Sequence, residues 1–257
     1  MLKLGKILDI DVSLHWTLFL LIGWTALSAP MGSMLASVAL ISCVFGCVLL
    51  HEFGHCLAAR QFGIGTSSIV LLPIGGVASL DRMPRDPKQE LWVAVAGPLV
   101  NVVIASLLFA IHGPILELSP VAGAWLGSLM YINIGLVVFN MLPAFPMDGG
   151  RVLRAISAMF MPYVKATNLA ASVGRVVAVL LGLVGLVNAN IVLMLIAGFV
   201  YFVGSAEARA VASDPLNYAT PKKKAKLSDG KVFRVIRDGI TVNVIWDDHA
   251  QVYRYVS

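Results

Sequence analysis

The stretch Leu49-Leu50-His51-Glu52-Phe53-Gly54-His55 determines the interpretation of this chain, because it places a metal-binding signature inside apolar sequence. His51 and His55 are four residues apart, so on a helix both imidazoles lie on one face, one turn from each other. That spacing suits two ligands of a single Zn²⁺, with Glu52 beside them as a candidate general base. The preceding residues, Ile41 to Leu50, include no charged side chain. The stretch therefore indicates catalytic metal chemistry inside a lipid bilayer.

The composition is that of a membrane protein. Of the 257 residues, 58% are hydrophobic and only 13% are charged, which excludes an ordinary soluble globular protein. Apolar stretches of roughly 20 residues, the length that crosses about 30 Å of hydrocarbon, recur along the chain. The first reads as a retained span rather than a cleaved signal peptide. We predict six membrane-spanning helices, at about 14–29, 34–60, 90–112, 122–142, 169–187 and 190–208.

The basic residues predict the orientation of these helices. Connections rich in Lys and Arg face the cytoplasm. Such residues occur before the first predicted span, in alternate connections, and after the sixth span, whereas the opposite connections, around 29–33, 112–121 and 187–190, contain none. Both termini are therefore expected to be cytoplasmic. The net charge of +5 then reflects topology and contact with lipid head groups, and it gives no case for nucleic acid.

Residues 63–80 are apolar but too rich in Gly and Pro for a spanning helix. Within them, 69–72 and 77–80 are short β-prone runs around a Pro-Ile-Gly-Gly turn, which is typical of a β-hairpin. Non-helical backbone at membrane depth is tolerated only where it is buried in protein or lines a wet cavity. We expect a membrane-associated hairpin near the metal, with a surface loop as the alternative.

Asp148 is the candidate third metal ligand. It is the only acidic residue between Glu117 and Glu207, and it follows a proline-containing break in the fourth predicted span. An ionisable residue near membrane depth is a functional candidate by default, although Asp is also a good helix N-cap. Two His nitrogens and one carboxylate oxygen would leave the fourth zinc position for water. Glu52 could accept a proton from that water and pass it to a leaving amine, which predicts amide hydrolysis with one Zn²⁺ per chain.

Two further segments are interpreted from their composition. Asn101, in the small-residue run 96–101 of the third span, would need a hydrogen-bond partner at that depth. We expect it to link helices, with a contact to the metal-site helix as the alternative. The tail, 211–257, combines the basic run 222–226 with alternating apolar residues that suit two or three short strands. We therefore divide the chain into a membrane domain, 1–210, with a catalytic core at about 34–150, and a cytoplasmic β-rich tail.

On these motifs the chain resembles the site-2 protease family of intramembrane zinc metalloproteases, peptidase family M50, in its six-span form without a PDZ insertion. The motifs are His51–His55, Gly75–Gly76, Ala96–Asn101 and Asn140–Gly150. The resemblance implies an all-α polytopic membrane protein and assigns the third zinc ligand to Asp148. It implies that Asn140 positions the peptide or stabilises the oxyanion. It also implies transmembrane helices as substrates, unwound into extended strand, with which the hairpin could pair by β-addition.

The leading hypothesis is a zinc endopeptidase that cleaves transmembrane segments of other proteins. We expect it to be a multi-pass protein of a bacterial or archaeal cell membrane. A membrane metal-ion transporter and a non-proteolytic scaffold are the alternatives. Transport favours polar residues along a path, whereas here they collect at one depth. The complete His, His, Asp and Glu set argues against an inactive scaffold. The tail is too short for the paired nucleotide-sensing domains of many six-span members. The sequence leaves the substrate, the activating signal and the oligomeric state open.

Overall fold

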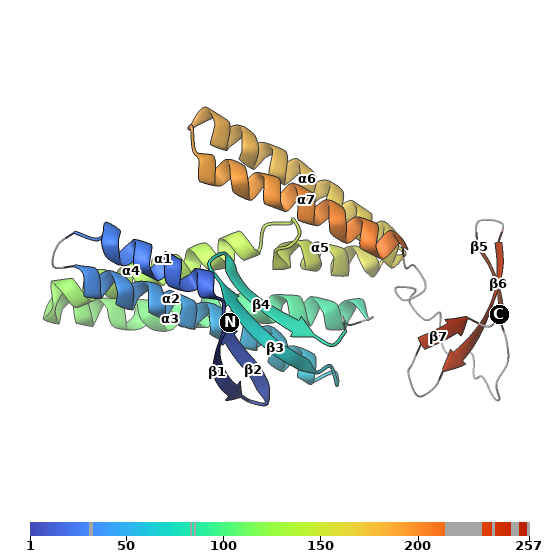
Figure 1. Cartoon of the computed structure of the whole chain (residues 1–257), viewed down its shortest axis with the longest axis horizontal. Helices are drawn as coiled ribbons and strands as arrows, with labels where there is room; N and C mark the ends of the chain where they lie inside the picture. Colours follow the sequence, from blue (N-terminus) through green and yellow to red (C-terminus); the bar gives the residue numbers. More distant parts are fainter. Residues whose placement is uncertain are drawn as a thin grey trace.

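The computed structural model describes residues 1–30, 33–82, 84, 86–213, 233–237, 240–247 and 252–255. Figure 1 shows that helices make up most of the chain. The helices are α1 (Trp16–Ser28), α2 (Met34–Arg60), α3 (Pro87–Leu118), α4 (Pro120–Asn140), α5 (Asp148–Ala158), α6 (Tyr163–Val187) and α7 (Ile191–Ser213). The strands are β1 (Leu2–Ile7), β2 (Ile10–Leu14), β3 (Thr66–Leu72), β4 (Gly75–Leu80), β5 (Phe233–Arg237), β6 (Ile240–Asp247) and β7 (Val252–Tyr255).

Five helices, α2, α3, α4, α6 and α7, are long and apolar enough to cross a membrane, with 21 to 32 residues each. The expected span at 14–29 forms α1, which has only 13 residues. At 1.5 Å per residue α1 is about 20 Å long, shorter than the hydrocarbon core of a bilayer. Residues 10–14 are taken up by strand β2, so the helix begins only at Trp16, and Pro30 follows its end. The prediction of six spans is therefore supported by helix length for five of them.

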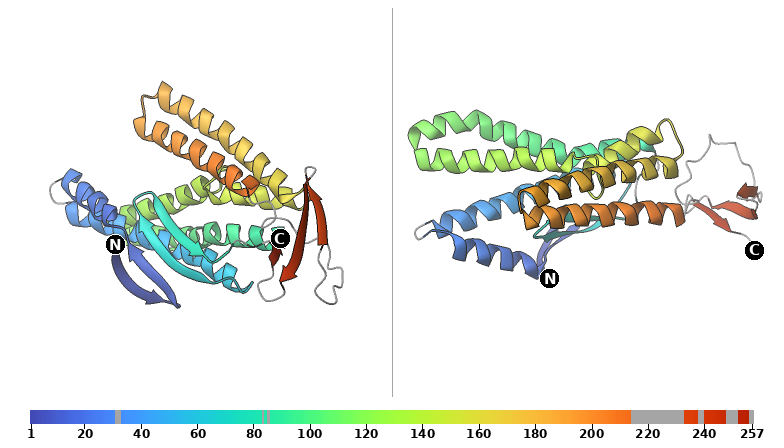
Figure 2. Two further views of the ribbon diagram at one scale, coloured as in Figure 1. Left: turned by 45° about the vertical axis from the view of Figure 1, so that its right-hand side comes forward. Right: turned by 90° about the horizontal axis from the view of Figure 1, so that it is seen from above.

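Helices α1 to α4 form one bundle, and the α6–α7 hairpin is joined to it through α5 (Figure 1; Figure 2). Small residues allow α2 and α3 to approach closely. A Cβ added at Gly54 of α2 would overlap the backbone of Ala96 and the side chain of Val100 on α3. Helix α3 contains Pro98, which supplies no backbone N–H to the helix. The close contact between α2 and α3, near the proline of α3, lies beside the two histidines of α2.

A four-stranded sheet with the order β1-β2-β3-β4 lies against this bundle. Strands β3 and β4 are the hairpin expected within residues 63–80, with Val70 paired to Val77. The N-terminal dozen residues, which show no clear strand signal, form β1 and β2, and β2 pairs with β3 in parallel. Val12 and Ile69 are fully buried and belong to a core shared with α1 and α2. The sheet is thus larger than the hairpin expected from sequence, and β1 and β4 are its two edge strands.

Strands β5, β6 and β7 form a separate three-stranded antiparallel sheet. They fall in the part of the chain for which short strands are expected. The basic run 222–226 lies outside the described residues.

Candidate metal centre

His51 and His55 lie on the face of α2 that points into the bundle. Each is only 5% exposed. Their Nε2 atoms are 3.1 Å apart, and the two rings meet edge to face. The i, i+4 spacing therefore places the two imidazoles side by side, as the sequence predicts.

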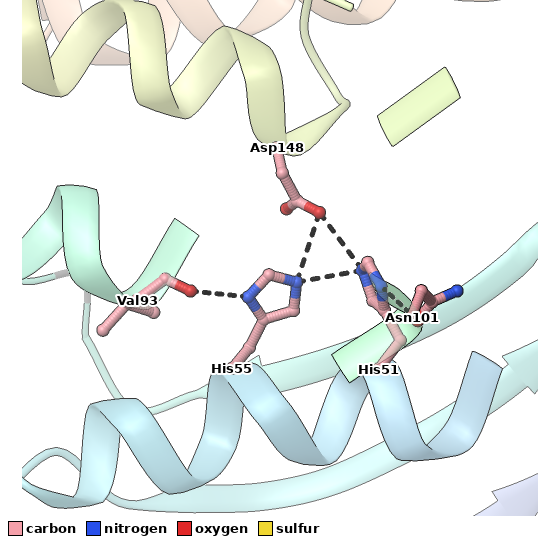
Figure 3. Close-up of polar contacts among 5 residues, drawn as sticks. All are labelled: His51, His55, Val93, Asn101 and Asp148. Atoms are coloured by element: carbon pink, nitrogen blue, oxygen red, sulfur yellow. Dashed lines mark hydrogen bonds and ion pairs between the residues drawn. The ribbon is translucent and has the colours of Figure 1, made fainter. Parts of the chain in front are cut away.

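Asp148 reaches this pair from the first residue of α5, which follows the irregular connection after α4. Its Oδ2 atom lies 3.1 Å from Nε2 of His51 and 3.3 Å from Nε2 of His55, and the residue is 6% exposed. Figure 3 shows the carboxylate pointing down from α5 towards both imidazoles. The structure thus brings together all three residues that the sequence nominates as metal ligands.

The opposite ring nitrogens are held by α3. Nδ1 of His55 donates to the carbonyl oxygen of Val93 at 2.7 Å, and Nδ1 of His51 donates to Oδ1 of Asn101 at 3.2 Å (Figure 3). A carbonyl oxygen can only accept, so the hydrogen sits on Nδ1 and a neutral imidazole leaves Nε2 as an acceptor. Such contacts behind metal-binding histidines fix both tautomer and ring orientation. Asn101 is fully buried, and the contact to the metal-site helix, the alternative left open by the sequence, is the one observed.

The geometry of the three acceptor atoms fits a metal ion. Zinc bonds of about 2.0–2.1 Å in a tetrahedral arrangement put neighbouring ligand atoms about 3.3 Å apart. The observed separations of 3.1 to 3.3 Å are close to that value. Three acceptors facing one another repel unless a cation lies between them, so the donor set itself favours a bound metal. Among the described residues, His51, His55 and Asp148 are the group that can hold one.

Electrostatics also favours an ionised ligand at Asp148, which lies outside the five membrane-length helices. Burial by itself raises the pKa of this carboxyl, but positive charge on His55 and His51, in the protonated form of the metal-free cluster, lowers the pKa more, to well below its usual range. Metal ligands must be deprotonated, so a carboxylate in this state is ready to coordinate.

Glycines make room for the cluster. A Cβ added at Gly97 of α3 would overlap Nε2 of both His51 and His55. A Cβ at Gly149 or Gly150 would overlap the backbone of the connection before α5. The glycines after Asp148 therefore allow α5 to begin directly against that connection, with the carboxylate facing α2.

The two remaining residues that the sequence singles out lie differently. Glu52 is half-buried and lies against β4, since a Cβ added at Gly76 would overlap its carboxylate. Asn140 is the last residue of α4 and is half-buried. In the described part of the chain, no hydrogen bond joins its amide to the metal cluster. The contact of Val93 with His55 could not be predicted from the sequence, because a backbone carbonyl is present at every residue and leaves no residue-type signal.

Comparisons with known proteins agree with this geometry. The family model described as peptidase family M50 matches residues 39–117 and 117–181. A zinc metalloprotease of Methanocaldococcus jannaschii is 38% identical over 210 residues, which cover 82% of this chain and 61% of that protein. Stage IV sporulation protein FB of Bacillus subtilis is 28% identical over 167 residues, which cover 65% of this chain and 55% of that protein. The chain therefore spans less than two thirds of the length of each of these curated relatives.

A solved structure is also similar. The structure of a site-2 protease from Methanocaldococcus jannaschii superposes with a TM-score of 0.59 at 36% sequence identity. The match covers 81% of this chain and 95% of that chain. The resemblance inferred from short motifs thus extends over the membrane helices and their connections.

Proposed function

The chain belongs to peptidase family M50, and we propose that it is an intramembrane zinc endopeptidase that hydrolyses peptide bonds in the membrane segments of other proteins. The observation that carries this proposal is the convergence of His51, His55 and Asp148 within 3.3 Å of one another in a bundle of membrane-length helices. Two imidazoles and one carboxylate form the ligand set of catalytic zinc sites, which suits one Zn²⁺ per chain.

The residues around the cluster suit amide hydrolysis. Zinc held there would polarise a substrate carbonyl and lower the pKa of a bound water. Val93 and Asn101 orient the imidazoles so that both Nε2 atoms are available. We propose that Glu52, which is next to His51 on the same helix, accepts a proton from water and returns it to the leaving amine. Burial of the ligands restricts bulk water at the reacting centre.

The edge of the sheet supports an extended substrate. Strand β4 is one of the two edge strands and, among the described strands, pairs only with β3. Gly76 of β4 lies directly against Glu52. A peptide that adds to the open edge of β4 would therefore pass the proposed base and the metal ligands. We propose that a transmembrane substrate unwinds locally and binds there as a strand.

Asn140 is the proposed contact for the substrate backbone or the oxyanion. It ends α4 immediately before the connection that leads to Asp148. Its amide makes no hydrogen bond to the cluster in the described part of the chain, which leaves it available for a peptide carbonyl.

We also propose that both termini are cytoplasmic and that the residues after α7 form a tail outside the membrane domain. Helix α7 ends at Ser213, so the boundary lies a few residues beyond the expected position 210. Strand β2 pairs with β3, so the N-terminal strands lie at the same end of α2 as the connection that follows it. Arg60 ends α2, and the connection after it contains further basic residues, which favours the cytoplasmic side.

The test uses the purified protein reconstituted in lipid vesicles with fluorescently labelled transmembrane peptides, with and without a helix-destabilising Gly-Pro pair. We expect cleavage by the wild type, faster for the destabilised peptides, and none by Glu52→Gln, although this variant retains zinc. Glu117→Gln, an exposed change on α3, is the matched control and should cleave normally. Equal cleavage by the wild type and Glu52→Gln would contradict the proposal. Zinc flux into vesicles without cleavage would instead indicate transport.

A further inference from the structure

A second cluster of buried charges lies along α5, away from the metal ligands. Arg154 of α5 is 1% exposed and Glu90 of α3 is 2% exposed. The Nε atom of Arg154 donates to Oε1 of Glu90 at 2.7 Å, and its Nη2 atom lies 2.6 Å from the same oxygen. The Nη1 atom donates to Oε1 of Glu207 on α7 at 2.6 Å. The rings of Phe145 and Tyr163 each lie 5.0 Å from its central carbon. Arg154 is thus enclosed by three helices and the connection before α5.

Stability alone does not account for this cluster. Removing two charges from water costs more than their attraction commonly returns, and apolar residues of similar volume often stabilise as well or better. Oε2 of Glu90 is buried and has no hydrogen-bond partner in the described part of the chain, which adds to that cost. The ion pairs do fix the relative orientation of the helices, because the planar guanidinium donates well only to carboxylates in a narrow range of positions.

Two of the helices that Arg154 joins, α3 and α5, also support the metal centre. Glu90 lies one helical turn before Val93, whose carbonyl orients His55. Arg154 lies six residues after Asp148, about 9 Å along α5. The contact of His55 with Asp148 joins α2 to α5, and the ion pair of Arg154 with Glu90 holds α5 at a second point, against α3. Two such points fix the tilt of α5, whereas one would leave it free to pivot.

We propose that Arg154 is a positioning residue for the metal centre: its ion pairs to Glu90 and Glu207 fix α5 against α3 and α7 so that Asp148 meets both imidazoles. This inference rests on the proposed metal-binding role of His51, His55 and Asp148. Glu207 is the accessible partner, since its side chain is 38% exposed while that of Arg154 is buried. A shift of α7 that separates Glu207 from Arg154 would loosen the third ligand.

The test measures metal binding without cleavage. The full chain, purified in detergent micelles and loaded with Co²⁺, should show the visible absorption of a tetrahedral site. Arg154→Gln should lower the Co²⁺ affinity about tenfold, the scale of lost support behind a ligand, and shift the absorption band. Glu207→Gln, which removes a partly exposed ion pair, should lower it about threefold. Arg154→Lys keeps the positive charge but lacks the planar, multiple-donor guanidinium, so its Co²⁺ affinity should lie between those of the wild type and Arg154→Gln.

Further variants separate the positioning role of Arg154 from the metal-binding role of the cluster. In the Arg154→Gln background, Glu207→Gln should have no further effect, because both act through one contact. Glu117→Gln, at the far end of α3, should bind Co²⁺ as the wild type does. A wild type without a tetrahedral Co²⁺ spectrum would overturn the proposed metal centre itself. A normal wild type with unchanged affinity and spectrum in both Arg154→Gln and Glu207→Gln would overturn only the positioning role. Should Arg154→Gln fail to fold, Glu207→Gln decides in the same way.

Discussion

The metal centre and the Arg154 cluster are two buried polar clusters that share α5, and they balance their charges differently. The metal centre joins α5 to α2, whereas Arg154 joins α5 to α3 and α7. At the first residue of α5, three acceptor atoms from His51, His55 and Asp148 face one another. Near the middle of the helix, Arg154 supplies its own positive charge between two carboxylates. The first cluster needs a bound cation between its acceptor atoms, whereas the second contains a cation of its own in Arg154.

This difference indicates a division of roles along α5. The helix has 11 residues and is not among the helices long enough to span a membrane. It contacts α3 and α6, and its first residue carries a ligand whose position must be accurate to a fraction of an ångström. The Arg154 cluster needs no added ion, so it can hold α5 in place before a metal ion binds. The metal centre then needs little rearrangement to bind its ion.

The largest expected effect on the contrast between the two clusters comes from removing the carboxylate at the metal centre. Asp148→Asn should abolish peptide cleavage and lower zinc affinity by more than about 100-fold, beyond the loss that follows removal of an outer contact. Zinc content by atomic absorption and competition with a chelator measure the effect. Asp86→Asn, which keeps a good N-cap at the start of α3, is the matched control. Full zinc occupancy in Asp148→Asn would show that the two imidazoles bind the ion with some other group.

A second perturbation fills the space above the imidazoles. Gly97→Ala adds a Cβ that overlaps Nε2 of both histidines, so zinc affinity should fall at least about tenfold and the free energy of unfolding by about 1–3 kcal/mol. Gly113→Ala is the control, because it lies on the same helix with no atom within 4 Å of the added Cβ. There the change should be neutral or slightly stabilising. Equal metal affinity in the two variants would contradict the close approach of α3 to the cluster.

A third and smaller perturbation removes only the support behind one ligand. Asn101→Leu takes away the acceptor for Nδ1 of His51 and should lower zinc affinity about tenfold, the lower end of the loss for such an outer contact, while the fold is retained. Ser106→Ala, an exposed change farther along α3, should leave the affinity unchanged. Chelator competition on both variants gives the comparison. If Asn101→Leu binds zinc as tightly as the wild type, His51 is oriented by packing alone.

The sequence predicts the metal centre better than the surrounding architecture. The spacing of His51 and His55 defines their shared face from helix geometry alone, and Asp148 stands out as a lone acid in apolar sequence. Local patterns cannot show that β2 pairs with β3, because the partners are separated by more than 50 residues and each strand is short. Nor do they show that Arg154 is buried, since the type of a residue does not report which distant carboxylates surround it. The role of Asn140 and the orientation of the termini stay predictions.

The two imidazoles also differ in how their support can be lost through mutation. His51 depends on a side chain, so a single codon change at Asn101 removes its partner. His55 depends on the main-chain oxygen of Val93, which every amino acid at that position would retain. Sequence drift can therefore loosen one ligand of the pair far more easily than the other. Among natural variants of this chain, we expect tolerance at position 93 for any residue that fits the space and intolerance at position 101.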